Sequence, residues 1–194
     1  MCERCNWSTS NPLMIKYHDE EWGVPLHDDR KLFEFFVLEG FQAGLSWQIV
    51  LNKREGFRKA FDFFNPEIVA NYDQQKMEEL MNNTSIIRNR LKIAACVNNA
   101  RRFLEVQKEF GSFDNYIWKF VDYKPVINRF TGLSEIPAKT LLSDKISNDL
   151  KKRGFKFVGS TFIYAHMQAT GMVNDHLTFC FRYQEINSKF KRRE

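Results

Sequence analysis

Residues 150–161 have the sequence Leu-Lys-Lys-Arg-Gly-Phe-Lys-Phe-Val-Gly-Ser-Thr, which indicates a basic helix end, a short turn and the start of a second helix. Ser143 can cap the first helix and Gly154 can end it. We expect the second helix to run from Gly159 to Thr170, as the last clear helix of the chain. Its first N–H groups have no partner within the helix, so they can hold a phosphate while Lys156 and its basic neighbours supply positive charge. The alternative is a solvated basic loop between two packed helices.

Helical signals fill most of the chain on either side of this stretch. The longest covers residues 86–110, where Ile93, Val97 and Ala100 recur on one buried face and Gly111 is a natural end. Further helices are expected over residues 28–39, 47–54, from 66 onward, 73–82 and 114–121, with an irregular stretch over residues 122–138. Alternation typical of strands is nearly absent. The sequence therefore predicts an all-α fold.

The length of 194 residues suits one domain. We expect two helical lobes with a pocket between them over residues 1–183, and a basic polar tail over residues 184–194 that is frayed from Ser188. The net charge of +5 permits a nucleic-acid partner without requiring one. We find no N-terminal signal segment and no apolar run of membrane-spanning length, so we expect a cytoplasmic protein without a membrane partner.

Cysteine and histidine residues near the two ends of the chain form a possible metal site. Cys5 and His18 lie near the N-terminus, and His176 and Cys180 lie four positions apart near the C-terminus, on one helix face or in a tight turn. Disulfides are rare in the cytoplasm, where such residues are more often metal ligands. Two thiolates and two imidazoles form a closed tetrahedral zinc set without an open position for water, so the role of one zinc ion here would be structural.

Other cysteines and histidines complicate or limit this assignment. Cys2 and Cys5 are themselves spaced like a pair of ligands, so Cys2 is an alternative ligand. His27 and His166 have no neighbours typical of a metal site. We interpret these two as surface histidines or as hydrogen-bonded core histidines.

Two further stretches bring acids and aromatic residues together. Residues 39–47 have the sequence Glu-Gly-Phe-Gln-Ala-Gly-Leu-Ser-Trp, and residues 17–23 have the sequence Tyr-His-Asp-Glu-Glu-Trp-Gly. A metal that draws the N-terminus inward would gather a set of rings near Glu39, namely Trp7, Tyr17, Trp22 and Trp47. Such a pocket suits a flat cation, such as an alkylated purine, because a desolvated ring face attracts a cation by up to about 2 kcal/mol. The alternative is a surface glutamate beside tryptophans that only fill the core.

Taken together, the chain resembles the 3-methyladenine DNA glycosylase I family of the helix-hairpin-helix DNA glycosylase superfamily. The matching stretches lie at residues 3–5, 17–25, 38–47, 133–137, 151–159 and 174–176. They span nearly the whole chain up to about residue 182. The resemblance implies an all-helical glycosylase in which a structural zinc site joins the N- and C-terminal segments.

The resemblance also implies a role for individual residues. The zinc ligands would be Cys5, His18, His176 and Cys180, with Cys2 left as a spare. Glu39 would be the catalytic residue, in a base pocket formed by Tyr17, Trp47, Trp22 and Trp7. The DNA contacts would come from two turns, through Gln42, Gly44 and Leu45 in the first and Lys156, Val158, Gly159 and Ser160 in the second. Leu45 would be the apolar wedge that enters the gap when a base leaves the stack.

Three positions depart from the superfamily pattern. A hairpin glycine is replaced by Phe157. The lysine nucleophile of bifunctional members is replaced by Thr161, which argues against Schiff-base chemistry and strand cleavage. The usual catalytic aspartate aligns with Asn174, although Asp175 is adjacent. Either the general base is missing or Asp175 replaces it, and we favour the first because a cationic base needs less help to depart.

These observations predict a monofunctional enzyme that acts as a monomer. It would flip alkylated adenine out of duplex DNA and hydrolyse the N-glycosidic bond, releasing 3-methyladenine without AP lyase activity. Two other functions are possible, a DNA-binding module without enzyme activity and a zinc-stabilised protein-interaction domain. The run from Glu39 to Trp47 favours the enzyme, because neither alternative needs a carboxylate among aromatic rings.

Overall fold

The computed structural model describes the backbone of residues 3–191 and the side chains of residues 3–188. Cys2 and the last three residues of the predicted tail lie outside the described residues. The helices are α1 (Pro12–Glu20), α2 (Asp29–Gln42), α3 (Trp47–Ala60), α4 (Pro66–Val69), α5 (Gln74–Asn82), α6 (Arg90–Phe110), α7 (Phe113–Trp118), α8 (Leu141–Lys152), α9 (Ser160–Ala169) and α10 (Phe181–Lys191). The strands β1 (Val126–Ile127) and β2 (Val173–Asn174) form one short parallel pair.

Side-chain caps set three helix starts at the predicted residues. Asp28, Asn65 and Asp73 each accept a backbone N–H of the first turn of α2, α4 and α5, respectively. Ser46 is the cap residue of α3 without such a bond, and Gly111 ends α6 in the left-handed conformation at φ 83°. These local signals therefore placed the starts of α2, α3, α4 and α5 and the end of α6, whereas α1 and α10 were not predicted.

Two predicted helix starts were wrong by a few residues. The start of α8 is capped by Thr140, and Ser143 is its third helical residue. The two side chains satisfy each other's backbone N–H groups in a capping box, so the helix begins one turn earlier than a Ser143 cap would place it. The start of α6 is at Arg90 because the Asn89 side chain accepts the N–H of Lys92.

The C-terminal region also differs from the prediction. The helix α9 is not the last, because α10 follows it and continues to Lys191. Ile186, on α10, is 1% exposed, so burial holds this helix against the protein. Residues 188–191, which were expected to be frayed, are part of α10.

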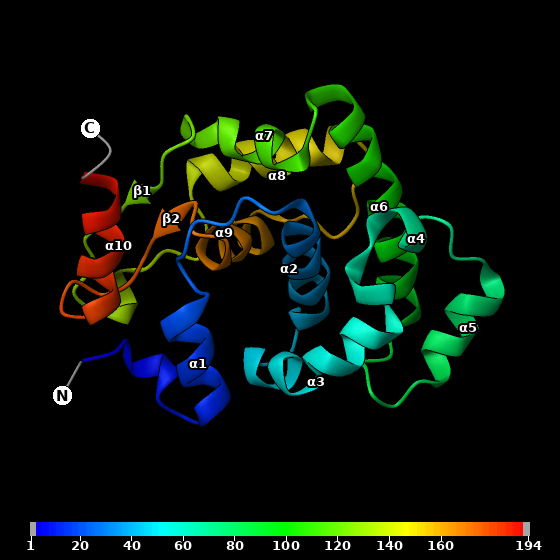
Figure 1. The fold of residues 1–194 in the computed structure, drawn as a ribbon, viewed down its shortest axis with the longest axis horizontal. Helices are drawn as coiled ribbons and strands as arrows, with labels where there is room; N and C mark the ends of the chain where they lie inside the picture. Colours follow the sequence, from blue (N-terminus) through cyan, green and yellow to red (C-terminus); the bar gives the residue numbers. More distant parts are fainter. Residues whose placement is uncertain (1–2, 192–194) are drawn as a thin grey trace.

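The centre of the protein is α2, which is buried on two sides (Figure 1). Leu32, Phe33 and Phe36 belong to the larger apolar cluster, together with residues of α3, α6, α7, α8 and α9. Phe35 faces a smaller cluster that also contains Cys5, Cys180 and residues of α1. In Figure 1, α1 and α10 lie on the same side of α2, and the smaller cluster joins residues from both ends of the chain. Among the described helices, none is both long and apolar enough to cross a lipid bilayer.

Backbone hydrogen bonds attach the segment after α1 to the end of α9. Gly23 donates to the carbonyl of Gln168 at 2.9 Å, and Leu26 donates to that of Thr170 at 3.1 Å. Gly171 ends this region with φ +71° and packs directly against the backbone of Val24. Close contact of two backbones therefore fixes the position of the N-terminal segment on α9.

Replacing Gly171 by Ala should separate these two backbones. An alanine Cβ would lie 2.3 Å from the carbonyl carbon of Val24, whereas at Gly44, which also has a positive φ, it would meet nothing within 4 Å. We expect Gly44→Ala to cost about 1 kcal/mol for the left-handed backbone. Gly171→Ala should cost about 1–3 kcal/mol more, because backbone cannot rotate away. Denaturant unfolding of the two variants measures the difference, and equal losses would contradict the contact.

Candidate active site and metal cluster

A cavity of ≈ 350 Å³ opens between the N-terminal segment, α2, α3 and α9. Its lining contains Glu39, Gln42 and all four aromatic residues assigned from the sequence to the base pocket. The full set is Trp7, Met14, Tyr17, Trp22, Glu39, Gln42, Trp47, Leu133, Ile136, Ala165 and Gln168. The convergence expected from the sequence is thus present in the structure.

The four rings form a connected group around the cavity. The ring centroids of Tyr17 and Trp47 are 5.3 Å apart, and those of Trp7 and Trp22 are 5.0 Å apart with nearly perpendicular planes. The indole N–H of Trp47 is buried and has no hydrogen-bond partner among the described residues. A buried donor without a partner is costly in a native protein, which suggests a donor kept for a guest molecule.

Glu39 lies near the end of α2 with its side chain only 3% exposed. Its Oε2 atom is 2.9 Å from Nδ1 of His166, on α9. Burial raises the pKa of Glu39, and the hydrogen bond from His166 opposes that rise. No local pattern in the sequence links His166 to Glu39, because the two residues are 127 positions apart.

Tyr17 is also buried against Glu39. Burial raises the pKa of Tyr17 well above its ordinary value, and the nearby carboxylate of Glu39 adds to the rise. The phenol therefore stays protonated at neutral pH and can donate a hydrogen bond. Carboxylate, phenol and indole together give the cavity one acceptor and two donors among aromatic faces.

The turn after α2 carries the predicted wedge. Leu45 is 40% exposed, and its N–H donates to the carbonyl of Gln42 at 2.7 Å. Gly44 has φ +83° with open space around it. Lys92, on α6, donates from Nζ to the carbonyls of Phe41 and Ala43 at 3.0 and 2.8 Å. A cation at the C-terminal end of α2 offsets the helix dipole and holds this turn in place.

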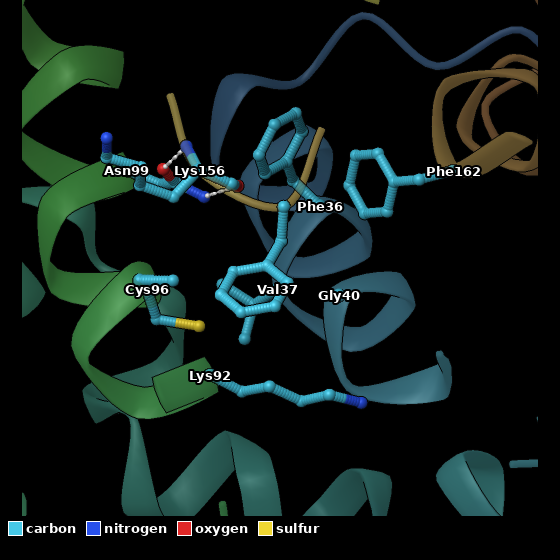
Figure 2. A pocket seen from close by; sticks show the side chains of 10 residues that line it. Phe36, Val37, Gly40, Lys92, Cys96, Asn99, Lys156 and Phe162 are labelled. Atoms are coloured by element: carbon cyan, nitrogen blue, oxygen red, sulfur yellow. Dashed lines mark hydrogen bonds between the residues drawn. The ribbon is translucent and has the colours of Figure 1, made fainter. Parts of the chain in front are cut away.

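The same face of α6 holds the second predicted DNA-binding turn, between α8 and α9. Asn99, seven residues after Lys92, accepts the N–H of Lys156 at 2.8 Å and donates to its carbonyl at 2.9 Å (Figure 2). Positions seven apart share a helix face. Figure 2 shows Lys92, Cys96 and Asn99 along that face, opposite Gly40 of α2. One rigid helix therefore sets the distance between the two turns.

The predicted residues of this second turn differ in exposure. Lys156 and Gly159 are exposed, whereas Val158 is 2% exposed and its carbonyl accepts a hydrogen bond from Ser147. The Val158 side chain is therefore core and offers no surface to DNA. Ser160 shares a 2.7 Å hydrogen bond with Ser143. Phe157, which replaces the superfamily glycine, keeps a left-handed φ of 57° and is 52% exposed.

Asp175 and Asn174 do not line the cavity. Asp175 is 1% exposed and accepts hydrogen bonds from Asn128, Tyr164 and Gln168. Of these partners, Gln168 lines the cavity, so Asp175 supports the wall rather than facing a guest. Asn174 is engaged with Asn187 and with the N–H of His176. This arrangement favours the interpretation in which the usual general base is missing.

The four predicted metal ligands lie together and are fully buried. The Cys180 sulfur is 3.5 Å from Nε2 of His18 and 3.7 Å from Nδ1 of His176, which is also 3.7 Å from the Cys5 sulfur. All four ligand atoms lie within 4.8 Å of one another. Ligands at the usual zinc distances stand about 3.4–3.8 Å apart in a tetrahedron. The cluster thus has the dimensions of a metal site, formed in a turn rather than on one helix face.

The outer nitrogens of both histidines are engaged in a way that fits metal ligands. His18 contacts Asp19 through Nδ1 at 2.7 Å, and His176 donates through Nε2 to the carbonyl of Trp22 at 3.0 Å. These bonds leave the lone pairs of the other two nitrogens directed at the sulfurs. Arg4 binds both carboxylate oxygens of Asp19, so the N-terminal segment is tied to the same shell.

The charges in the cluster also fit a cation. A hydrogen bond from the Cys5 thiol lowers the pKa of Cys180, and the resulting thiolate raises the pKa of Cys5. Burial lowers the pKa of His176, which keeps its imidazole neutral. The backbone N–H of Leu177 donates to the Cys5 sulfur at 3.4 Å. A second thiolate needs a positive ion beside it, because two negative sulfurs repel each other in a buried site.

The known proteins that resemble this chain in sequence and those that resemble it in structure are of the same kind. The family model described as methyladenine glycosylase matches residues 7–183. The chain is 50% identical over 181 residues to DNA-3-methyladenine glycosylase 1 of Escherichia coli (strain K12), covering 93% of this chain and 97% of that protein. A crystal structure of 3-methyladenine DNA glycosylase I matches with a TM-score of 0.89 at 51% identity, covering 92% of this chain and 98% of the other.

A structure of 3-methyladenine DNA glycosylase I from Staphylococcus aureus, concerned with the structural basis of 3-methyladenine recognition, also has a TM-score of 0.89. It is 35% identical, and the match covers 92% of this chain and 95% of that one. All these relatives are of one class, the DNA glycosylases. The chain belongs to the methyladenine glycosylase family. It is therefore a glycosylase, an enzyme of the hydrolase class, and the expected mostly helical fold is confirmed.

Replacing Glu39 by Gln should change how stability depends on pH. Burial raises the pKa of Glu39 above its ordinary 4.5, so the folded protein holds this proton more tightly than the unfolded chain does. The carboxylate therefore costs stability as pH rises above about 4.5, and the cost is complete above the raised native pKa. We expect the wild type and Glu39→Gln to have equal free energies of unfolding near pH 4. Near pH 8 the variant should be more stable by about 1–3 kcal/mol. Urea denaturation at the two pH values measures this difference. A difference independent of pH would contradict the buried carboxylate.

Proposed function

We propose that the protein is a monofunctional glycosylase that removes 3-methyladenine from duplex DNA by hydrolysis of the N-glycosidic bond, without AP lyase activity. The observation that carries this proposal is Glu39, buried beneath a cavity of aromatic rings that also holds the unpartnered N–H of Trp47. The Escherichia coli relative, at 50% identity, and a relative from Haemophilus influenzae, at 46%, are both named as DNA-3-methyladenine glycosylases, and the Staphylococcus aureus structure concerns recognition of this base.

The cavity fits the chemistry of an alkylated purine. A purine methylated at N3 carries a positive charge spread over a flat ring while it is attached to the sugar. Rings such as those of Tyr17 and Trp47 attract such a cation, and the desolvated site strengthens the attraction. Glu39 accepts a charge-assisted hydrogen bond from the exocyclic amino group of the base. The Trp47 N–H would find its acceptor on a ring nitrogen of the guest.

Bond cleavage in this site needs little acid–base help. The bond between the sugar C1′ and the base nitrogen breaks with both electrons going to the base, which neutralises the positive ring. A water molecule then adds to the electron-poor C1′ and gives its proton to solvent. Glu39 stabilises the positive charge that is shared between base and sugar as the bond stretches. Thr161 supplies no amine, so a Schiff base and strand cleavage do not follow.

DNA would approach along α6 and the two turns that it supports. The α8–turn–α9 unit acts as a helix-hairpin-helix, with Lys156, the Gly159–Ser160 backbone and the N-terminal end of α9 near phosphates. Leu45, at the other turn, would fill the gap left by the flipped nucleotide, which offsets part of the few kcal/mol of unstacking. The protein would do this as a monomer, because both turns belong to one chain.

The Cys/His cluster would hold one structural zinc ion. The two thiolates, the two neutral imidazoles and their hydrogen-bonded outer nitrogens fit this ion. With four protein ligands the ion has no open position, so it would take no part in the reaction. It would stabilise the packing of the N-terminal segment on the C-terminal turn, which places Trp7 and Tyr17 beside the cavity.

Changes at the cavity should lower excision without unfolding the protein. We expect Glu39→Gln to reduce 3-methyladenine release by about 10²–10³-fold, because it removes the charge that faces the cation. Trp47→Ala should reduce release about tenfold or more through lost stacking. The assay is single-turnover release of base from methylated duplex DNA, identified by chromatography. Glu55→Gln, at an exposed carboxylate of α3, is the matched control and should behave as wild type.

The outcomes of this assay also separate the alternatives. Wild-type release rates in both Glu39→Gln and Trp47→Ala would contradict the assignment of the pocket. A DNA-binding module without enzyme activity would release no base at all. A protein-interaction domain would bind methylated DNA weakly and with little dependence on salt, whereas phosphate contacts predict a steep loss of affinity as salt rises.

Removing one proposed zinc ligand should affect stability first and activity only as a consequence. We expect Cys180→Ala to lose its zinc, measured by mass spectrometry of metals, and to lose at least about 3 kcal/mol of stability. Cys96→Ala is the control, because Cys96 is a buried thiol on α6 outside the cluster. It should keep its metal and lose about 1 kcal/mol. A Cys180→Ala protein that is free of zinc but fully stable would refute the structural role.

A further inference from the structure

His166 is the buried residue whose environment the proposed mechanism leaves unexplained. It lies on α9, is fully buried and holds Oε2 of Glu39 at 2.9 Å through Nδ1. Its ring packs against Phe36 at a centroid distance of 5.5 Å and is stacked with Phe162 at 6.4 Å. Figure 2 shows these two phenylalanines side by side between α2 and α9. Its other nitrogen, Nε2, has no hydrogen-bond partner among the described residues.

This environment selects one protonation state of the pair. An imidazolium would place an N–H at Nε2 with no acceptor, inside an apolar wall, which is costly. A neutral ring with its proton on Nδ1 donates to Glu39 and leaves only a lone pair at Nε2. The pair is then a neutral histidine and a carboxylate, so one negative charge remains at the cavity.

Other ionisable groups near Glu39 do not supply a hydrogen bond or a charge that replaces the contact with His166. Tyr17, on α1, faces the carboxylate from the opposite element, but as a neutral phenol it adds no charge. Arg54 and Glu21 act on Tyr17, and Arg54 is held in ion pairs with Glu21 and Glu34. Of these groups, His166 is the one that contacts the Glu39 carboxylate by a hydrogen bond, at 2.9 Å.

We propose that His166 is a positioning residue for excision, which orients Glu39 by donating from Nδ1 to Oε2 and keeps its carboxylate ionised, leaving Oε1 for the base. This inference rests on the proposed function of the cavity. It also connects the two parts of the site, because α9 begins at Ser160 beside the DNA-binding turn and lines the cavity with Ala165 and Gln168, on either side of His166. The start of α9 would bind phosphate, and His166 on the same helix would hold the Glu39 carboxylate in position for the flipped base.

The test compares three replacements of His166 in single-turnover release of 3-methyladenine across pH. His166→Asn places an amide N–H near the position of Nδ1 and should remain within about threefold of wild type. His166→Leu and His166→Gln lack a donor at that position. We expect both to lose about 10- to 100-fold of the release rate at neutral pH. The acid limb of the plot of release rate against pH should also move to higher pH in these two variants, because a carboxylate without its donor protonates more easily. In the Glu39→Gln background, His166→Leu should cause no further loss.

Three results would overturn the proposal. These are a wild-type rate and pH profile in His166→Leu, equal losses in all three variants with unchanged pH profiles, or additive losses with Glu39→Gln. A readout without activity separates this inference from the proposed function. In the His166→Leu background, the cost of the Glu39 carboxylate, measured against Glu39→Gln, should keep growing to a higher pH than in the wild type. If the wild type releases no base, the proposed function fails, and this stability measurement still decides the role of His166.

Discussion

The burial of α2 on two sides is the constraint on which the rest of the structure depends. One side faces the larger apolar cluster, and Phe35 on the other side faces the cluster formed by the two ends of the chain. A helix enclosed in this way has no solvent-exposed stripe along most of its length, and its last turn carries Glu39 into the protein. The cavity therefore forms where the two clusters meet, with walls from α1, α3 and α9.

Holding the two chain ends together requires more than apolar packing. The bonds of Gly23 and Leu26 to the end of α9 fix the backbone, and the Cys/His cluster fixes the turn that precedes α10. Arg4 extends this attachment to the first described residues through Asp19. Because Trp7 and Trp22 belong to this segment, the aromatic walls of the cavity are only as well placed as these long-range contacts make them.

The cavity contains several groups that cost stability. Among the described residues, a buried carboxylate and an indole N–H without a partner line the cavity, and an imidazole nitrogen without a partner belongs to the ring that binds this carboxylate. Such groups are rare in native cores, and they collect where a protein must bind a polar or charged ligand. The protein tolerates them because the surrounding apolar clusters are large and α6 braces both adjacent turns through Lys92 and Asn99.

The sequence by itself determined the features that depend on neighbouring residues. Asp28, Asn65 and Asp73 were identified as caps because a cap bonds within its own first turn, and the set of possible metal ligands followed from residue type. The capping box of Thr140 and Ser143 is also local, although Ser143 was expected to be the cap itself. Only the tertiary structure decided that Val158 is core and that Asp175 supports a wall. It also decided that His166 meets Glu39. The physical reason is that hydrogen bonds between residues more than a hundred positions apart depend on how whole helices pack, and no local pattern records that packing.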